Sequence, residues 1–209
     1  GWPFDVLSER VIVDYGDVAF DYANIPAFPE TLTAHIRGIL QAGAASVVLG
    51  GDHYVSFPIL RAYAEIYGPM SLIQIDAHTD TWADDDMDRV DHGTMFYKAV
   101  KSGIVDPATS VQIGIRTTNE DTLGVHIIDA AECHRIDPAY APGTGTPVWG
   151  GLSSAQAAAL LRALAGINIR GGDVVEVSPP FDTTGATAIA GAHVATELCQ
   201  LLGWRMRSD

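Results

Sequence analysis

Short, continuously apolar runs alternate with amphipathic helical segments along this chain of 209 residues, and this alternation constrains the fold most strongly. Strands that are apolar on both faces occur mainly in parallel sheets covered by helices on both sides. The pattern therefore predicts an α/β protein with a mainly parallel central sheet in a three-layer αβα arrangement. One domain over residues 1–209 is expected, because this length suits a single compact core.

The expected elements follow from apolar content and spacing. The expected strands are Val11–Val13, Ala45–Leu49, Met70–Ile75, Val111–Ile115, Val125–Ile128 and Asp173–Val177. The expected helices are Phe28–Gly43, Phe57–Tyr67, Thr94–Lys101, Ser153–Leu164 and Thr187–Leu202. Ser153 is a good N-cap for the fourth helix. Residues 79–93 form an acidic loop, and residues 137–151 form a loop rich in proline and glycine.

Polar side chains gather where two of these strands end. One strand is followed by GGDH, which ends at His53, and the next by DAHTD, which runs from Asp76 to Asp80. Side chains at alternate positions of an extended chain point the same way, so Asp76, His78 and Asp80 can converge. Two carboxylates and an imidazole suit divalent cations such as Mn²⁺, Zn²⁺ or Fe²⁺. Ligands of parallel sheets bind outside the carboxyl ends of the strands, where Glu176 also falls, so a metal site is predicted there.

Composition excludes several classes of partner. The formal net charge of -14 argues against nucleic acid or an anionic membrane surface, and it is compatible with a cationic substrate. No apolar run reaches the length that spans a membrane. Two cysteines, Cys133 and Cys199, give no disulfide framework and indicate a reducing compartment, the cytoplasm.

Four further motifs extend the pattern: DHGTMFY from Asp91, VQIGIR from Val111, PAYAPGTGTP from Pro138, and VVEVSP around Glu176. Together with the turns at His53 and Asp76–Asp80 they resemble the ureohydrolases, the family of arginases and agmatinases, and most of all bacterial agmatinases. The resemblance covers nearly the whole chain. It implies an arginase-like fold and a cytoplasmic homo-oligomer, a trimer or hexamer. It also implies hydrolysis of a small cationic guanidino substrate, agmatine, to putrescine and urea for polyamine biosynthesis.

The resemblance also implies a metal centre. His53, Asp76, His78 and Asp80 match four of the six ligands that hold two Mn²⁺ ions in the family. In this match Asp76 bridges the ions, His53 and Asp80 serve one ion, and His78 serves the other. A metal-bridging hydroxide is then the nucleophile that attacks the guanidinium carbon.

Three catalytic roles are implied by the same match. Asp80 orients the hydroxide by hydrogen bonding. His92 resembles the proton-shuttle histidine of the family, a role that suits an imidazole near neutral pH. Glu176 resembles the carboxylate that pairs with the planar guanidinium of the substrate.

One part of the family pattern is absent. The family carries its last two metal ligands as Asp-x-Asp on an apolar strand just before an Asp-Pro pair. Here that pair is Asp137-Pro138, and family spacing places Glu132 and His134 where the two aspartates belong. The residues around them do not form an apolar strand. The simplest interpretation is that a helix and the ligand-bearing strand are missing near residues 135–136, and that Glu132 and His134 are accidents of the junction.

The missing strand has a chemical consequence. One metal ion keeps His53, Asp76 and Asp80, whereas the other keeps only His78 and the shared Asp76. A chain of this sequence is therefore expected to be inactive or poorly folded, and hydrolase activity is expected where the strand exists. The N-terminus is also shorter than in the family, which fits a fragment of a longer protein, a misassembled gene, or a sequence from which segments have been dropped.

Other interpretations remain open. The chain could be a non-catalytic homologue with a binding or regulatory role, a single-metal amidohydrolase resembling the deacetylases, or a hydrolase of guanidinobutyrate or another guanidino acid. His35, His126 and His193 are expected to be structural or surface residues. The acidic run from Asp84 to Asp91 is expected to be a solvated loop. The glycine-rich segment at 143–147 lacks the context of a phosphate-binding loop.

Overall fold

The computed structural model describes residues 2–133, 144 and 146–208, and its five strands pair only in parallel. An isolated antiparallel bridge joins Thr144 to Val177. Strand β1 (Val47–Leu49) pairs with β5 (Gly172–Val174). Strand β3 (Val111–Ile115) lies between β2 (Ile73–Ile75) and β4 (His126–Asp129). The expected parallel arrangement is confirmed, and β3 has the expected bounds, although β1, β2 and β5 are shorter than expected. Among the described residues the strands form two sheets, β1–β5 and β2–β3–β4, with no pairing between β5 and β2.

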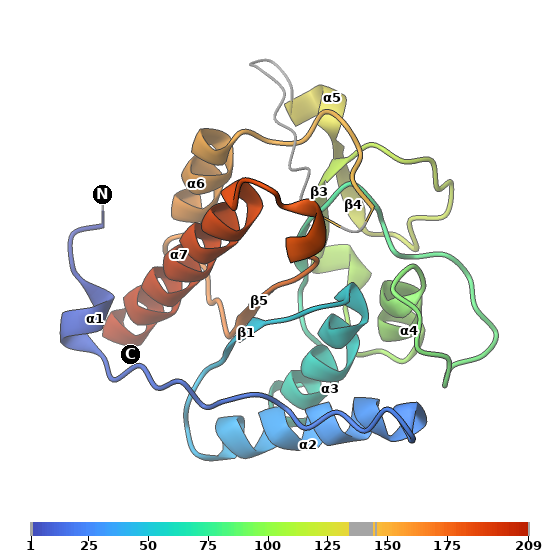
Figure 1. Cartoon of the computed structure of the whole chain (residues 1–209), viewed down its shortest axis with the longest axis horizontal. Helices are drawn as coiled ribbons and strands as arrows, with labels where there is room; N and C mark the ends of the chain where they lie inside the picture. Colours follow the sequence, from blue (N-terminus) through green and yellow to red (C-terminus); the bar gives the residue numbers. More distant parts are fainter. Residues whose placement is uncertain (1, 134–143, 145, 209) are drawn as a thin grey trace.

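Helices cover both sides of the strands, which gives the three-layer arrangement (Figure 1). Helices α2 (Phe28–Gln41), α3 (Ser56–Tyr67) and α4 (Met95–Lys101) lie to one side of β1 and β5, and α6 (Ser154–Ala163) and α7 (Ala186–Ser208) to the other. Two short helices, α1 (Val6–Glu9) and α5 (Ala130–Cys133), lie at the periphery. Among the described residues, no helix combines the length and apolarity that a membrane span requires.

Two apolar clusters hold the helices in place. In the first, Leu32, Ile36 and Leu40 from one face of α2 pack against Ile59 and Tyr63 of α3, as the helical spacing predicts. In the second, α3 and the turn before it pack against α4 and the residues after it, through Tyr54, Phe57, Met95, Phe96, Ala99 and Val105. Both clusters lie on the α3 side of the strands, so they support the loops that follow β1 and β2.

Helix α6 begins as its sequence predicts. The Ser153 hydroxyl accepts a hydrogen bond from the Gln156 N–H, and the Gln156 side chain accepts one from the Ser153 N–H. This reciprocal capping box satisfies two N–H groups that the first turn of a helix leaves free.

The prediction of a strand at Val11–Val13 is wrong. These residues lie in irregular chain, and the three side chains are 92%, 48% and 67% exposed. An apolar triplet forms a strand only where it pairs with a neighbouring strand edge, and Val11–Val13 pairs with none of the strands among the described residues.

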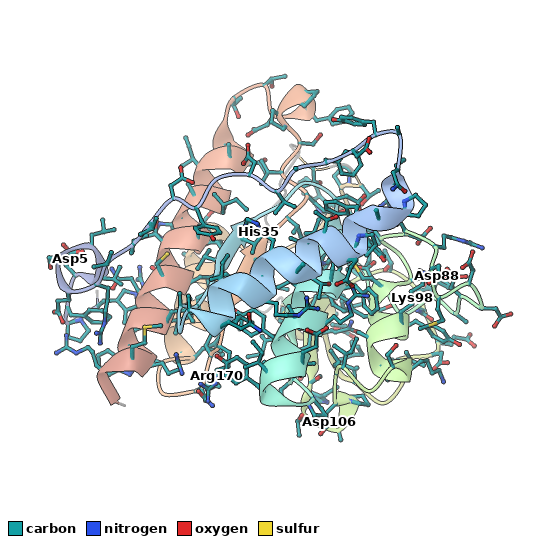
Figure 2. All side chains as sticks on the ribbon, turned by 90° about the horizontal axis from the view of Figure 1, so that it is seen from below. Asp5, His35, Asp88, Lys98, Asp106 and Arg170 are labelled. Atoms are coloured by element: carbon teal, nitrogen blue, oxygen red, sulfur yellow. The ribbon has the colours of Figure 1, made fainter. Side chains whose placement is uncertain are left out.

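The acidic loop is also less solvated than expected. Asp84 is buried, and its carboxylate lies 3.3 Å from the ammonium of Lys98 on α4. The Lys98 side chain is itself fully buried. The same ammonium donates a hydrogen bond to the carbonyl of Arg89. In Figure 2 the Lys98 label lies beside that of Asp88, the residue before Arg89. A buried ammonium therefore ties the loop at 82–93 to α4.

Replacing Lys98 with methionine is expected to lower the free energy of unfolding by about 1–3 kcal/mol, because the Arg89 carbonyl loses its donor. The loop should also become more sensitive to proteolysis. Lys101→Met on the same helix is the matched control, since Lys101 is exposed, and a change of about 0.5 kcal/mol or less is expected there. Equal destabilisation of the two variants would contradict the role of Lys98. Thermal melting and limited proteolysis measure both effects.

Candidate functional site

His53 lies at the start of a short 3-10 helix (His53–Val55) directly after β1. The turn is fixed because the Asp52 carboxylate accepts a hydrogen bond from the Tyr54 N–H. His53 is only 6% exposed, and its ring contacts the ring of Phe96 edge to face at 5.5 Å between centroids. Packing therefore fixes this imidazole in one orientation.

Two carboxylates converge on His53 from the turn after β2. The Nδ1 atom of His53 lies 2.9 Å from Oδ2 of Asp80 and 3.1 Å from Oδ2 of Asp76. The turn does not stay extended as expected: Asp80 adopts a left-handed φ of 51°, and its carbonyl accepts the N–H of Phe96 at the start of α4. This bend, rather than strand alternation, brings the second carboxylate to the imidazole.

His78 lies beside this group. Its Nδ1 atom is 3.4 Å from Oδ1 of Asp76, and the same oxygen accepts the His78 backbone N–H at 3.0 Å. The side chain of His78 is partly exposed, so it faces the open side of the site. The four residues expected as metal ligands are thus brought together, with Asp76 between the two imidazoles.

The charges of the group are strongly coupled. Burial opposes a charge on His53, but hydrogen bonds to Asp76 and Asp80 outweigh it and raise the pKa of His53 to about 10. Burial also disfavours ionisation of Asp76, yet hydrogen bonds with His53 and His78 hold the pKa of that carboxyl well below its usual range. Burial raises the pKa of Asp80. The two carboxylates thus create a site that favours a positive charge.

The donor set fits a divalent cation. One ligand atom each from His53, Asp76 and Asp80 lie within 4.8 Å of one another. Two hard carboxylate oxygens and a borderline imidazole nitrogen suit Mn²⁺, Zn²⁺ or Fe²⁺. The structure therefore contains a His/Asp group that could bind a metal ion, at the edge where the sequence predicts it.

A buried amide pair supports the carboxylates, and sequence reasoning missed it. The Gln74 side-chain amide donates to Oδ2 of Asp76 at 3.0 Å and lies 3.4 Å from Oδ2 of Asp80. The amide of Gln112 on β3 donates to the Gln74 oxygen at 2.5 Å and to the Thr79 carbonyl at 2.6 Å. Both glutamines point from strands into a buried layer, so polar residues inside expected apolar strands were the available signal.

Replacing Gln74 with leucine is expected to weaken metal binding by about 10–100-fold, as is typical when a residue that orients metal ligands is lost. The Asp76 and Asp80 carboxylates would lose a shared donor. Gln41→Leu at the exposed end of α2 is the control and should leave the affinity unchanged. Calorimetric titration with Mn²⁺ measures the effect, and equal affinities for the two variants would contradict it.

The candidate proton-shuttle residue His92 lies at the exposed mouth of the site. Its Nδ1 atom is 2.7 Å from Oδ2 of Asp52, and this hydrogen bond raises the pKa of His92. The side chain of His92 is 53% exposed. Asp52 was not singled out in the sequence, although it stands next to His53 in the GGDH turn. Its carboxylate fixes both the backbone turn and the orientation of His92.

Glu176 follows β5 in a left-handed conformation with φ of 62°. Its N–H donates to the carbonyl of Gly51 at 2.8 Å, so the β5–β1 pairing carries it to the GGDH turn. Burial raises the pKa of Glu176, and the carboxyl is close enough to His53, Asp76 and His92 to feel their charges. A half-buried carboxylate thus faces the cavity that the candidate ligands line.

The remaining candidates lie elsewhere. His35 packs against the ring of Tyr15, and His126 is exposed on β4. His193 on α7 is 3.5 Å from Glu197. Glu132 is exposed in α5 and does not join the group of described ligands, whereas His134 lies outside the described residues.

Comparison with known proteins gives a consistent relationship. The family model described as "Arginase family" matches residues 2–136 and again residues 134–200. The agmatinase of Chromobacterium violaceum is 44% identical over 229 aligned positions, which cover 96% of this chain and 71% of that protein. This stretch is longer than the chain of 209 residues, so the relative has residues within it that have no counterpart here.

Two solved structures have the same fold. A hypothetical agmatinase from Burkholderia thailandensis has a TM-score of 0.93 and 48% identity, covering 100% of this chain and 75% of that one. The proclavaminate amidino hydrolase of Streptomyces clavuligerus has a TM-score of 0.86 and 34% identity, covering 92% and 76%.

Proposed function

The chain belongs to the arginase family, and on this premise we propose that it hydrolyses agmatine to putrescine and urea. The observation that carries the proposal is the group of His53, Asp76 and Asp80 at the carboxyl ends of β1 and β2. It lies in a chain that is 44% identical to an agmatinase over 96% of its length.

In this proposal His53, Asp76, His78 and Asp80 hold manganese, with Asp76 positioned to share its two oxygens between His53 and His78. Bound Mn²⁺ lowers the pKa of a coordinated water, which supplies a nucleophile at neutral pH. His53 must lose its proton to act as a ligand, so metal binding replaces one positive charge by another between the two carboxylates.

The other residues bind substrate and move protons. Glu176 presents a half-buried carboxylate, which can bind the planar guanidinium through paired charge-assisted hydrogen bonds. Asp80 accepts a hydrogen bond from the attacking water. His92, oriented by Asp52 at Nδ1, donates a proton from Nε2 to the departing amine. Addition of water to the guanidinium carbon and loss of the amine yield urea and putrescine.

We also propose that a segment carried by the relatives is missing from the chain near residues 135–136. Two observations support this: the family matches meet at residues 134–136, and the aligned stretch exceeds the length of the chain. The described residues then carry one side of a two-metal centre, so weak binding of the second Mn²⁺ and low activity are expected. Glu132 and His134 have no role in this account.

The cellular setting is proposed by analogy with the family. We expect the protein to be a cytoplasmic homo-oligomer, either a trimer or a hexamer. Its reaction would serve polyamine biosynthesis. The two cysteines, Cys133 and Cys199, are both free, which fits a reducing compartment.

The test compares the chain with a variant that carries the missing segment of the Chromobacterium relative between residues 135 and 136. With Mn²⁺, we expect little urea from the chain itself and rapid urea release from agmatine by the variant. Asp76→Ala in the same variant is the control and should release none. A folded, manganese-loaded variant that releases no urea would show that the chain is a non-catalytic homologue. Faster release from guanidinobutyrate than from agmatine would overturn the substrate assignment.

A further inference from the structure

Two buried glutamines, Gln74 on β2 and Gln112 on β3, lie beneath the turn that carries the candidate metal ligands. They are direct partners in the register of the two strands, so their side chains lie on the same face of the sheet. Strands of a sheet that is covered on both faces are normally apolar on both faces. Burial of an amide is costly unless it makes hydrogen bonds, so this glutamine pair needs a physical explanation.

Backbone carbonyls fix which way each amide of the glutamine pair points. The Gln112 nitrogen lies 2.6 Å from the carbonyl oxygen of Thr79, and the Gln74 nitrogen lies 3.1 Å from that of His78. A carbonyl oxygen only accepts hydrogen bonds, so each of these contacts requires an NH₂ group. The Gln112 nitrogen also donates to the Gln74 oxygen. The donors of the pair thus run in one direction, from Gln112 through Gln74 toward the ligand turn.

The glutamine pair ends on the two carboxylates of the metal group. The Gln74 nitrogen donates to Oδ2 of Asp76 at 3.0 Å and lies 3.4 Å from Oδ2 of Asp80. His53 Nδ1 contacts the same two oxygens. The other oxygen of Asp76, Oδ1, accepts the backbone N–H of His78 instead. The pair therefore holds the oxygens that face His53, and not the oxygen that faces His78.

One polar atom of the glutamine pair has no hydrogen-bond partner among the described residues. This atom is the buried side-chain oxygen of Gln112, and a buried acceptor without a donor destabilises a fold. Turning the amide over would not help, because its oxygen would then face the oxygens of Thr79 and Gln74. The Gln112 donor is therefore present despite a loss of stability, which is typical of functional positions.

We propose that Gln112 is a positioning residue for the metal group, and that it holds the Gln74 amide against the two carboxylates. Without the Gln112 donor the Gln74 oxygen would be buried and unpaired, and the side chain would turn toward the cavity that it lines. Asp76 and Asp80 would then lose the donor that they share. Residues that orient ligands in this way raise the affinity for the metal ion. The inference rests on the metal centre of the proposed function.

Calorimetric titration of the intact chain with Mn²⁺ tests the proposal. Gln112→Met keeps the approximate length of the side chain and removes the donor, so we expect the affinity to fall by about 10–100-fold. Gln200→Met is the matched control, because Gln200 on α7 also has a buried side-chain oxygen without a partner among the described residues. Its affinity should be unchanged. Equal affinities for the two variants would overturn the proposal.

A second comparison separates a positioning role from a purely structural one. If Gln112 acts through Gln74, its loss matters only while Gln74 is present. Adding Gln112→Met to Gln74→Leu should therefore weaken binding by less than about threefold further, since residues in one hydrogen-bond network are not additive. An equal loss in both backgrounds would show that Gln112 acts independently of Gln74, and the proposal would be wrong.

The double variant also decides the question where Gln112→Met alone does not fold. It replaces both amides by apolar side chains, and such a joint replacement costs less stability than removal of one partner. Its affinity is then compared with that of Gln74→Leu. Similar affinities support the proposal, and a further loss of about tenfold or more contradicts it.

The outcome is separable from the proposed hydrolysis, because metal affinity is measured without turnover. Mn²⁺ binding that depends on Gln112, with no urea release by the variant that carries the missing segment, retains the positioning role and counts against the hydrolase. Urea release by that variant, with no effect of Gln112→Met on Mn²⁺ affinity, retains the hydrolase and overturns the positioning role. A chain that binds no Mn²⁺ overturns both.

Discussion

Replacing Asp76 with alanine is expected to weaken Mn²⁺ binding by at least about 100-fold. The side chain lies 3.1 Å from His53 Nδ1 and 3.4 Å from His78 Nδ1, so its loss removes the group that joins the two imidazoles. Loss of a residue that only orients a ligand typically costs about 10–100-fold, and a ligand itself should cost more. Calorimetric titration with Mn²⁺ measures the change.

The matched control for this variant is Asp85→Ala. Asp85 is an exposed carboxylate of the neighbouring acidic loop, so its loss removes the same charge from the same region. Unchanged affinity is expected. If Asp85→Ala weakens binding as much as Asp76→Ala, general electrostatic attraction rather than coordination accounts for the metal affinity.

Replacing Phe96 with alanine is expected to lower the free energy of unfolding by about 3–5 kcal/mol, as large-to-small changes of aromatic core residues do. Phe96 is 2% exposed, packs within the cluster between α3 and α4, and contacts the His53 ring. Metal affinity should fall as well, because the imidazole loses the surface that fixes its orientation.

Phe181→Ala is the control for this second variant. Phe181 is 62% exposed, so a change of about 0.5 kcal/mol or less is expected. Chemical denaturation followed by fluorescence gives both values. A cost near zero for Phe96→Ala would show that the cluster does not support the site.

Most helices and strands of this fold could be predicted from the sequence, because their positions follow from the local spacing of apolar residues. Leu32, Ile36 and Leu40 on α2 and the Ser153 cap on α6 are where the pattern predicts them. The prediction of a strand at Val11–Val13 was wrong because a strand depends on a pairing partner, and three residues do not specify that partner. The interruption between β5 and β2 depends on which strands become neighbours, which periodicity does not specify.

Part of the candidate metal site could be predicted from the sequence for a related reason. His53, Asp76, His78 and Asp80 follow apolar runs, and parallel strands bring their carboxyl ends to one edge. The left-handed turn at Asp80 that completes the convergence depends on tertiary contacts with α4, which the sequence does not display.

The supporting residues were harder to find for the same reason. The amide of Gln112 reaches the Gln74 side chain, and the Asp52 carboxylate reaches His92, only after the elements have packed. The contact between Lys98 and Asp84 is of this kind too, since it joins a loop to α4. Such pairs carry no spacing signal in the sequence.

Anomalous diffraction from crystals of the chain grown with Mn²⁺ tests directly whether His53, Asp76 and Asp80 bind the ion. We expect a manganese peak within bonding distance of His53 Nδ1 and the carboxylates of Asp76 and Asp80. No peak at this group, or a peak only among the exposed carboxylates of the loop at 84–91, would contradict it.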